Sequence, residues 1–334
     1  MLFQPAIIAL LLASALCVVG LAASAPFTLE VIRRWNIASG SEAQLRLERR
    51  TYLFSTLLAG ILLLQLASVL LYVFNAEKIS GMFVGAMCAV GTLNVNPWGF
   101  PALEAKVAVF FLAAMWLAIN HVDSQARDYP LVRVKYALLL LLAPLLAATA
   151  WIELRFFLGL KADVITSCCG SLFSEGSPTL VAEAAALAPQ PALWLFYGGL
   201  GAAIAAAAWH GLRGGRTGYA LAAASAVAFA AAIAGILSFV SLYVYEHPHH
   251  HCPFCILKPD YGYQGYWLYL PLFVATAAGF AAGAVQPFAR IASLREIVPD
   301  FARRMATVAA WGFLIVAAVA AFMIWNSRLI LLEH

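Results

Sequence analysis

Eight long apolar stretches divide the sequence, and each is about as long as a membrane is thick. The hydrocarbon core of a bilayer is roughly 30 Å thick and a helix rises about 1.5 Å per residue, so about 20 apolar residues cross it. Strands are excluded because the stretches do not alternate and an open sheet edge cannot be satisfied in lipid. The predicted fold class is therefore all-α, a polytopic integral membrane bundle. The predicted spans are approximately 5–27, 51–75, 101–121, 135–158, 190–210, 219–245, 264–288 and 306–326.

The composition supports this class. Hydrophobic residues make up 64% of the chain and charged residues only 11%, whereas a soluble domain carries roughly a quarter charged residues. No basic run suggests nucleic acid, and the partner expected first is the lipid bilayer. We predict a single membrane domain over 1–334. The first stretch is interpreted as a retained helix rather than a leader because no positive charge precedes it.

The basic residues predict the orientation. Under this topology, fourteen of the 20 lysines and arginines fall in the connections on one side and six on the other. The richer side should be cytoplasmic. Both termini and three longer connections then face outward, namely loop one (about 76–100), loop two (about 159–190) and loop three (about 246–265). We expect a multi-pass protein of a bacterial inner membrane.

Five of the six cysteines lie in these outward loops: Cys88, the adjacent Cys168 and Cys169, and Cys252 and Cys255. Five thiols on an oxidising side cannot all pair within one chain. Adjacent Cα atoms are about 3.8 Å apart, which is short for a disulfide. One alternative is that one of the adjacent pair bonds to Cys88 or to the loop-three pair and leaves the other as an attacking thiol. The other is a fixed bridge from Cys88 that staples two loops. The sixth cysteine, Cys17, is predicted to be a packing residue in the first span.

Cys252-Pro253-Phe254-Cys255 is the more specific element. Two intervening residues bring both sulfurs within bonding reach and place the first at the start of a helical turn. A helix N-terminus and nearby cations lower the pKa of a thiol, and His249, His250, His251 and Lys258 are candidate cations. The interpretation is a nucleophile at Cys252 and a resolving thiol at Cys255. The same spacing also occurs in zinc sites and inert staples.

The segment 252–257, Cys-Pro-Phe-Cys-Ile-Leu, resembles the active-site motif of the DsbB and vitamin K epoxide reductase families. In those families, an outward Cys-x-x-Cys passes electrons to a quinone, and cysteines of another loop exchange with a soluble thioredoxin-like partner. The resemblance implies that Cys252 and Cys255 are the quinone-proximal pair and that Cys88, Cys168 and Cys169 are shuttle thiols. It covers six residues. The chain departs from the families in its eight spans, its adjacent shuttle cysteines and the Lys-Pro that follows the motif.

Aromatic rings follow the motif at the expected membrane edge. Tyr261, Tyr263, Tyr266 and Trp267 could cover a quinone headgroup as a cofactor-binding surface. The alternative that we favour from the sequence is an interfacial aromatic belt.

A metal site is the alternative to redox chemistry. Imidazole and thiolate suit zinc or copper, and Met82 and Met87 beside Cys88 would add thioethers for Cu(I). We find no file of ionisable ligands through the membrane, which a permeating ion usually needs. The candidate ligands are His247, His249, His250, His251, Cys252 and Cys255.

These patterns favour an inner-membrane thiol–disulfide oxidoreductase. It would pass electrons between a periplasmic thioredoxin-like partner and quinone or another membrane component. The first alternative is a protein that handles copper or zinc. The second is a non-catalytic subunit of a membrane complex whose cysteines form structural disulfides.

Overall fold

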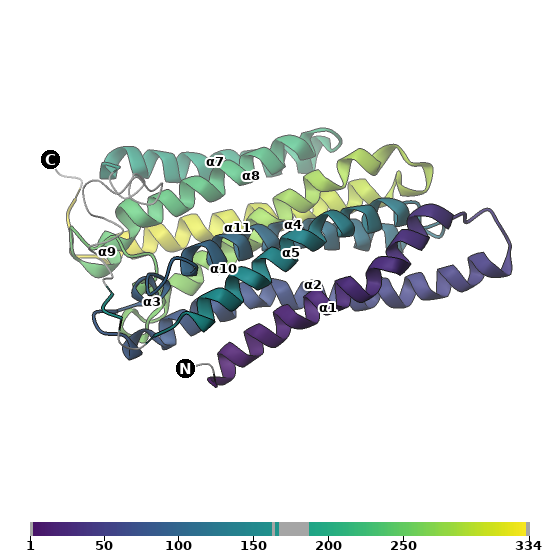
Figure 1. Ribbon diagram of the computed structural model, residues 1–334. Coiled ribbons are helices and arrows are strands. Elements are labelled where there is room, and N and C mark those ends of the chain that lie inside the picture. Colours follow the sequence, from purple (N-terminus) through teal and green to yellow (C-terminus); the bar gives the residue numbers. More distant parts are fainter. Residues whose placement is uncertain (1–2, 162–163, 167–186, 332–334) are drawn as a thin grey trace. The chain divides into compact units, whose positions relative to one another are not determined.

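The computed structural model describes residues 3–161, 164–166 and 187–331 (Figure 1). Within these residues there is no strand, and eight helices are long and apolar enough to cross a membrane. The prediction of an all-helical multi-pass protein is confirmed, and every predicted span corresponds to a helix. The long helices are α1 (Pro5–Arg34), α2 (Glu42–Lys78), α4 (Gly99–Gln125), α5 (Val132–Leu158), α7 (Pro189–Arg213), α8 (Thr217–Gly235), α10 (Gln264–Ala284) and α11 (Ile297–Asn326).

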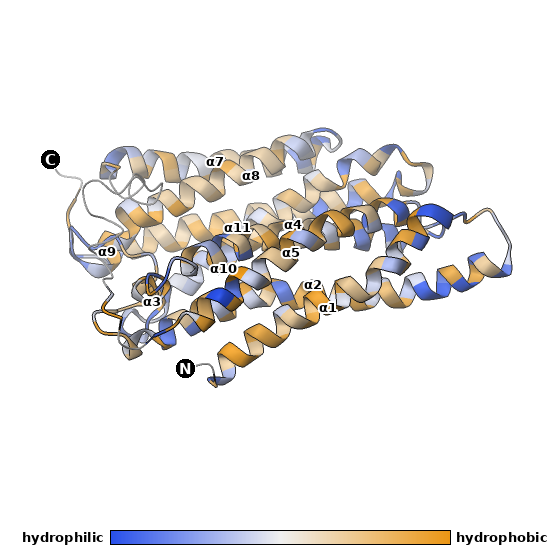
Figure 2. Cartoon of the chain, viewed as in Figure 1, coloured by the Kyte–Doolittle hydropathy of each residue, from blue (hydrophilic) through white to orange (hydrophobic). Residues whose placement is uncertain are grey.

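The helices extend beyond the apolar stretches because polar residues continue them. Helix α2 starts at Glu42, and Ser41 Oγ accepts a hydrogen bond from the Gln44 N–H at 3.3 Å, which caps its first turn. Figure 2 shows the helix bodies mostly hydrophobic, with hydrophilic residues gathered toward their ends. The hydrophobic length therefore sets where a span lies but not where its helix ends.

The described residues form two compact units, and each is described by itself. Unit 1 comprises Met1–Asn75, Val95–Lys161 and Pro287–Asp300, and unit 2 comprises Ala76–Asn94, Ala162–Gln286 and Phe301–His334. Whether they act as the single membrane domain predicted above stays a prediction.

In unit 1, α5 packs along both α1 and α4. Aromatic rings join these helices to α2: Phe27 stacks on Phe54 with ring centroids 4.4 Å apart and meets Tyr136 edge-on at 5.9 Å. Trp116 and Cys17 are buried in the same core. The burial of Cys17 in α1 is consistent with the packing role expected for it.

In unit 2, α8 lies between α7 and α10, and small residues let these helices approach. A Cβ at Gly199 of α7 would lie 2.9 Å from the Ala231 Cβ, and one at Gly283 of α10 would lie 2.6 Å from the Ala222 Cβ. Glycine and alanine at such contacts are typical of membrane helices, whose association depends on close packing.

The sixth span contains a π-helical turn, η2 (Ile236–Val240), between α8 and the short helix α9 (Ser241–Tyr245). Helix α9 ends at Glu246, whose backbone lies in the left-handed region with φ 51°. A π-turn adds one residue to a helix and is often found at functional sites. This turn leads the chain directly into loop three.

Short helices lie within loops one and three and within the connection before α11. They are η1 (Ser80–Met82), α3 (Ala89–Leu93), η3 (Cys255–Leu257), η4 (Pro259–Tyr261), η5 (Gln286–Arg290) and η6 (Ala292–Leu294).

Candidate functional site

Loop three folds back on the ends of α9 and α10, and two tyrosines hold it there. The Tyr245 hydroxyl donates to the Cys252 carbonyl at 2.5 Å and accepts from the Ile256 N–H at 2.9 Å. The Tyr269 hydroxyl donates to the Pro253 carbonyl at 2.8 Å. Each bond satisfies a backbone group of the Cys-x-x-Cys segment, so the hydroxyls fix the backbone on which both thiols stand.

Loop one presents Cys88 at the start of α3. The Cys88 carbonyl accepts hydrogen bonds from the Gly91 N–H at 3.0 Å and the Thr92 N–H at 3.4 Å. The next residue is also held, because the Ala89 N–H donates to Glu77 Oε2 at 2.7 Å. Cys88 itself is fully buried. The loop therefore holds this thiol inward rather than toward solvent.

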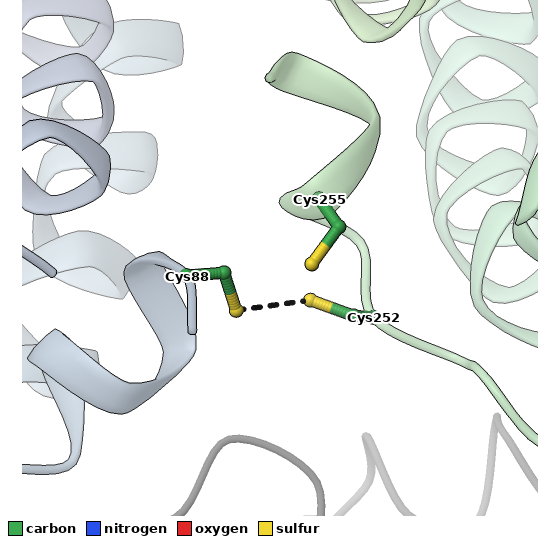
Figure 3. Close-up of side chains that lie close together, drawn as sticks. All are labelled: Cys88, Cys252 and Cys255. Atoms are coloured by element: carbon green, nitrogen blue, oxygen red, sulfur yellow. Dashed lines mark hydrogen bonds between the residues drawn. The ribbon is translucent and has the colours of Figure 1, made fainter. Parts of the chain in front are cut away.

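The two loops bring three thiols together in unit 2. The sulfur of Cys88 lies 3.3 Å from that of Cys252, although the residues are 164 positions apart. The sulfurs of Cys88, Cys252 and Cys255 all lie within 4.8 Å of one another (Figure 3). Their exposed fractions are 0%, 1% and 6%. A disulfide is about 2.05 Å long, so Cys88 and Cys252 are in contact and a small movement would bond them. We call these residues the three-cysteine cluster.

The contact supports one part of the predicted topology. Loops one and three must lie on the same side of the membrane for Cys88 to touch Cys252. Cys168 and Cys169 lie outside the described residues, so their shuttle role stays a prediction. The outward orientation of this side also stays a prediction.

The acidity of the cluster differs from the sequence prediction. The pKa of the Cys252 thiol is raised above its ordinary value by its hydrogen bond with Cys255 and by burial. The pKa of the Cys255 thiol is also raised. Its hydrogen bond with Cys252 lowers this pKa, but its hydrogen bond with Cys88 and its burial together raise the pKa by more. The expectation of a lowered pKa was wrong because three buried thiols face one another and η3 is only three residues long.

A lysine and a glutamate border the cluster. Lys258 Nζ lies 3.4 Å from Glu77 Oε1, and Lys258 also donates to the Met87 carbonyl. The pKa of Lys258 is raised despite partial burial, because Glu77 and the Cys255 and Cys88 thiols favour its charged form. The sequence singled out Lys258 as a cation but missed Glu77 and Tyr245. An acidic residue in the other cysteine loop was the available signal for Glu77.

The histidines do not join the thiols. Among the described residues, the group that could ligate a metal at this place is Cys88, Cys252 and Cys255. His251 Nδ1 instead donates to the Leu237 carbonyl of the π-turn at 2.9 Å. The ring of His250 lies on Tyr245, with centroids 4.1 Å apart, and its pKa is lowered, mainly by burial.

The predicted mixed histidine–cysteine site is therefore not assembled. His247 and His249 are exposed, as are the side chains of Met82 and Met87. Three thiolates by themselves suit a soft ion such as Cu(I) or zinc, so the residues present still fit a metal site of a different composition.

The aromatic residues after the motif divide into two groups. Tyr263 and Trp267 are 51% and 68% exposed, as residues of an interfacial belt are. Tyr261 packs on Tyr245 with centroids 4.8 Å apart, and Tyr266 is half-buried. A quinone headgroup at these rings stays a prediction.

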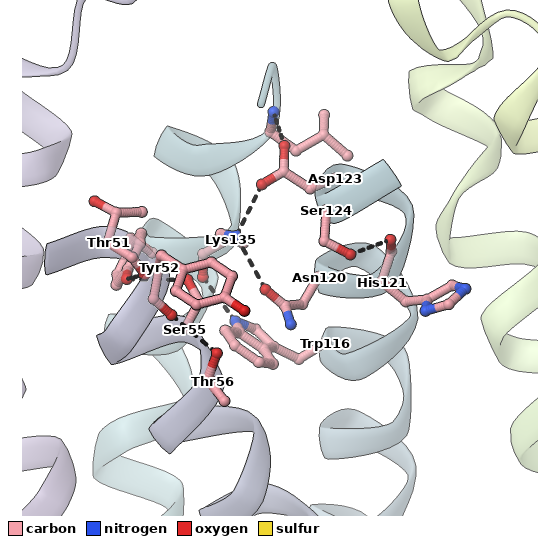
Figure 4. A network of polar contacts seen from close by, with 12 residues as sticks. Thr51, Tyr52, Ser55, Thr56, Trp116, Asn120, His121, Asp123, Ser124 and Lys135 are labelled. Atoms are coloured by element: carbon pink, nitrogen blue, oxygen red, sulfur yellow. Dashed lines mark hydrogen bonds and ion pairs between the residues drawn. The ribbon is translucent and has the colours of Figure 1, made fainter. Parts of the chain in front are cut away.

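Unit 1 contains buried charges that the sequence did not reveal. Figure 4 shows Lys135 Nζ between Asp123 Oδ2, 2.8 Å away, and Asn120 Oδ1, 3.0 Å away. The second Asp123 oxygen accepts from the Leu131 N–H at 2.7 Å. The ion pair is almost completely buried, with side chains 0% and 3% exposed. The two charged groups therefore depend on protein partners rather than water.

A second ion pair lies toward the other ends of α4 and α5. Lys106 Nζ is 3.0 Å from Glu153 Oε1, with side chains 1% and 0% exposed. Ser14 donates to Glu153, and Lys106 donates to Ser68 Oγ at 3.3 Å. Four helices thus contribute to one polar centre. The two buried lysines are not loop charges, and leaving them out changes the basic asymmetry only to thirteen against five.

Comparisons with family models, with curated proteins and with solved structures give no match. The function is therefore inferred from the geometry of the site. Three mutually accessible thiols can move a disulfide among themselves or hold a soft metal ion.

Proposed function

We propose that the chain is a membrane thiol–disulfide oxidoreductase in which Cys88, Cys252 and Cys255 exchange one disulfide. The observation that carries the proposal is the 3.3 Å contact of the Cys88 and Cys252 sulfurs with Cys255 at hand. A structural staple needs two cysteines held together and no third thiol beside them. Exchange needs a third thiol within reach of the bonded pair.

The internal step conserves electrons. Starting from a Cys88–Cys252 disulfide, the Cys255 thiolate attacks the Cys252 sulfur. The Cys252–Cys255 bond forms, the Cys88–Cys252 bond breaks, and Cys88 leaves as a thiolate that takes up the proton given up by Cys255. Net turnover requires two partners: a dithiol protein on the outer side that supplies two electrons and two protons, and a two-electron acceptor in the membrane. A quinone is the acceptor class that the sequence resemblance implies.

Disulfide mapping of single Cys→Ser variants tests the proposal. Cys255→Ser should accumulate a Cys88–Cys252 bond and Cys88→Ser a Cys252–Cys255 bond, each resolved by mass spectrometry after acid trapping. Cys252→Ser should abolish oxidation or reduction of a soluble thioredoxin-like partner, and Cys17→Ser is the matched control. The contrary result is the same disulfide in every variant that retains both of its cysteines, with the redox state of the partner unchanged. That result would establish a staple and refute exchange.

A metal centre is the second candidate, and the burial of three sulfurs within 4.8 Å of one another favours it. The purified, reduced protein would then hold about one copper or zinc per chain. Because the histidines lie outside the cluster, His249→Ala and His251→Ala should leave the metal content unchanged, whereas Cys88→Ser should abolish it. Stoichiometric metal with this dependence would replace the redox proposal.

The outward orientation and the inner-membrane location belong to the same proposal, because exchange needs the oxidising side. Asp260 in loop three and Arg216 between α7 and α8 are both exposed. A single cysteine introduced at Asp260 should react with an impermeant thiol reagent in intact spheroplasts. One introduced at Arg216 should react only after permeabilisation. The reverse pattern would overturn the orientation.

A further inference from the structure

Lys258 is attached to both cysteine loops. Its side chain is 23% exposed, its Nζ pairs with Glu77, and it donates to the Met87 carbonyl of loop one. Its own N–H donates to the Cys255 carbonyl at 3.0 Å. One lysine therefore bonds to the residue just before Cys88 and to Cys255 itself.

Lys258 lies close to two of the three thiol residues. Its Nζ reaches the carbonyl one residue before Cys88, and its backbone N–H bonds to the Cys255 carbonyl. In the exchange proposed above, Cys252 is the sulfur common to both disulfides. Cys255 and Cys88 are then the groups that carry negative charge, one as it attacks and the other as it leaves. The lysine lies beside the two positions where charge develops.

The other titratable groups around Lys258 leave its charge in place. Glu77 is its ion-pair partner. His250 has a lowered pKa, mainly through burial, so it is neutral at pH 7 and does not repel the lysine. Tyr261 has a raised pKa, also through burial, and stays protonated. Asp260, next to Tyr261, is exposed to solvent.

We propose that Lys258, positioned by Glu77, stabilises the thiolates of Cys255 and Cys88 in turn as the disulfide moves on Cys252. This inference rests on the proposed exchange. The role of the lysine is to select which thiols of the buried, apolar cluster ionise. The Glu77 carboxylate orients the lysine and accepts from the N–H next to Cys88, and its negative charge moderates the attraction between the lysine and the thiolates.

Thiolate titration tests the role directly and without turnover. The background is reduced protein with Cys252→Ser, and with Cys17, Cys168 and Cys169 replaced by serine. Ultraviolet absorbance of the thiolate then reports Cys88 and Cys255. Lys258→Met should raise the pH midpoint by about one unit, the lower end of the shift that a nearby opposite charge produces. Lys258→Arg should restore it, and Lys78→Met, an exposed lysine next to Glu77, is the matched control.

An unchanged midpoint in Lys258→Met would overturn the inference even if disulfide mapping shows exchange. A shifted midpoint with one fixed disulfide would refute the exchange and leave the electrostatic role.

Discussion

Both units bury polar or ionisable groups, but the partners of these groups differ between the units. In unit 1, Lys106 faces Glu153 and Lys135 faces Asp123, so each charge meets its opposite. In unit 2, Cys88, Cys252 and Cys255 face one another, so like groups lie together and more than one disulfide can form among them. Opposite partners in a buried site lock one arrangement, whereas like partners leave several arrangements close in energy. We infer that the ion pairs maintain the fold and that the thiols perform the chemistry.

The largest test breaks the ion pair at Glu153. Lys106→Met leaves a fully buried carboxylate without its cation, and removing one partner of such a pair costs about 3–5 kcal/mol. Thermal unfolding in detergent should show the loss, while Glu104→Gln at an exposed position of the same helix should not. Cys252→Ser should cost less than about 1.5 kcal/mol, because no buried charge is uncovered. Equal losses in Lys106→Met and Cys252→Ser would remove the distinction between the units.

The second test weakens the other ion pair more gently. Asp123→Asn removes the charge opposite Lys135, but its remaining oxygen can still accept from the Leu131 N–H, and Asn120 still binds the lysine. The expected loss is about 2 kcal/mol, the scale of a hydrogen bond to a charged group. Asp128→Asn in the adjacent exposed turn is the control. If Asp123→Asn loses no more folding free energy than the control, the ion pair does not stabilise the fold.

The third test uses pH on the thiol side. Because the pKa values of reduced Cys252 and Cys255 are raised, both are protonated at neutral pH. Each further pH unit should therefore increase the thiolate fraction about tenfold, equivalent to about 1.4 kcal/mol. The alkylation rate of the reduced protein should climb steadily from about pH 7 to about pH 9. A plateau in the rate below about pH 8 would contradict the raised values.

The smallest effect is expected at Tyr245. Tyr245→Phe removes the hydroxyl shared by the Cys252 carbonyl and the Ile256 N–H, at a cost of about 1 kcal/mol. The loosened segment should be alkylated faster at Cys252, measured by peptide mass spectrometry. Tyr261→Phe, whose ring packs on Tyr245, is the control. Identical rates in Tyr245→Phe and in the wild type would show that the hydroxyl does not hold the loop.

The sequence predicts the spans well because bilayer thickness fixes the length of an apolar stretch. It also placed loops one and three on one side, since an even number of spans separates loops that share a side. It could not predict the contact of Cys88 with Cys252, because the tyrosine hydroxyls and the Lys258–Glu77 pair that bond to the two loops meet only in the folded chain. The buried pairs were missed because an isolated Lys106 or Glu153 near the end of an apolar stretch resembles an interfacial charge.

The π-turn at Ile236–Val240 makes the length of the sixth span part of the site. Each residue of a helix turns the chain by about 100°. The π-turn accommodates one residue more than an α-helical turn, so a regular α-helix through the same residues would rotate α9 by about that angle. The Tyr245 hydroxyl would swing away from Cys252, and the Leu237 carbonyl would lose His251. The backbone path of the turn, rather than any one of its side chains, therefore sets where Tyr245 holds Cys252.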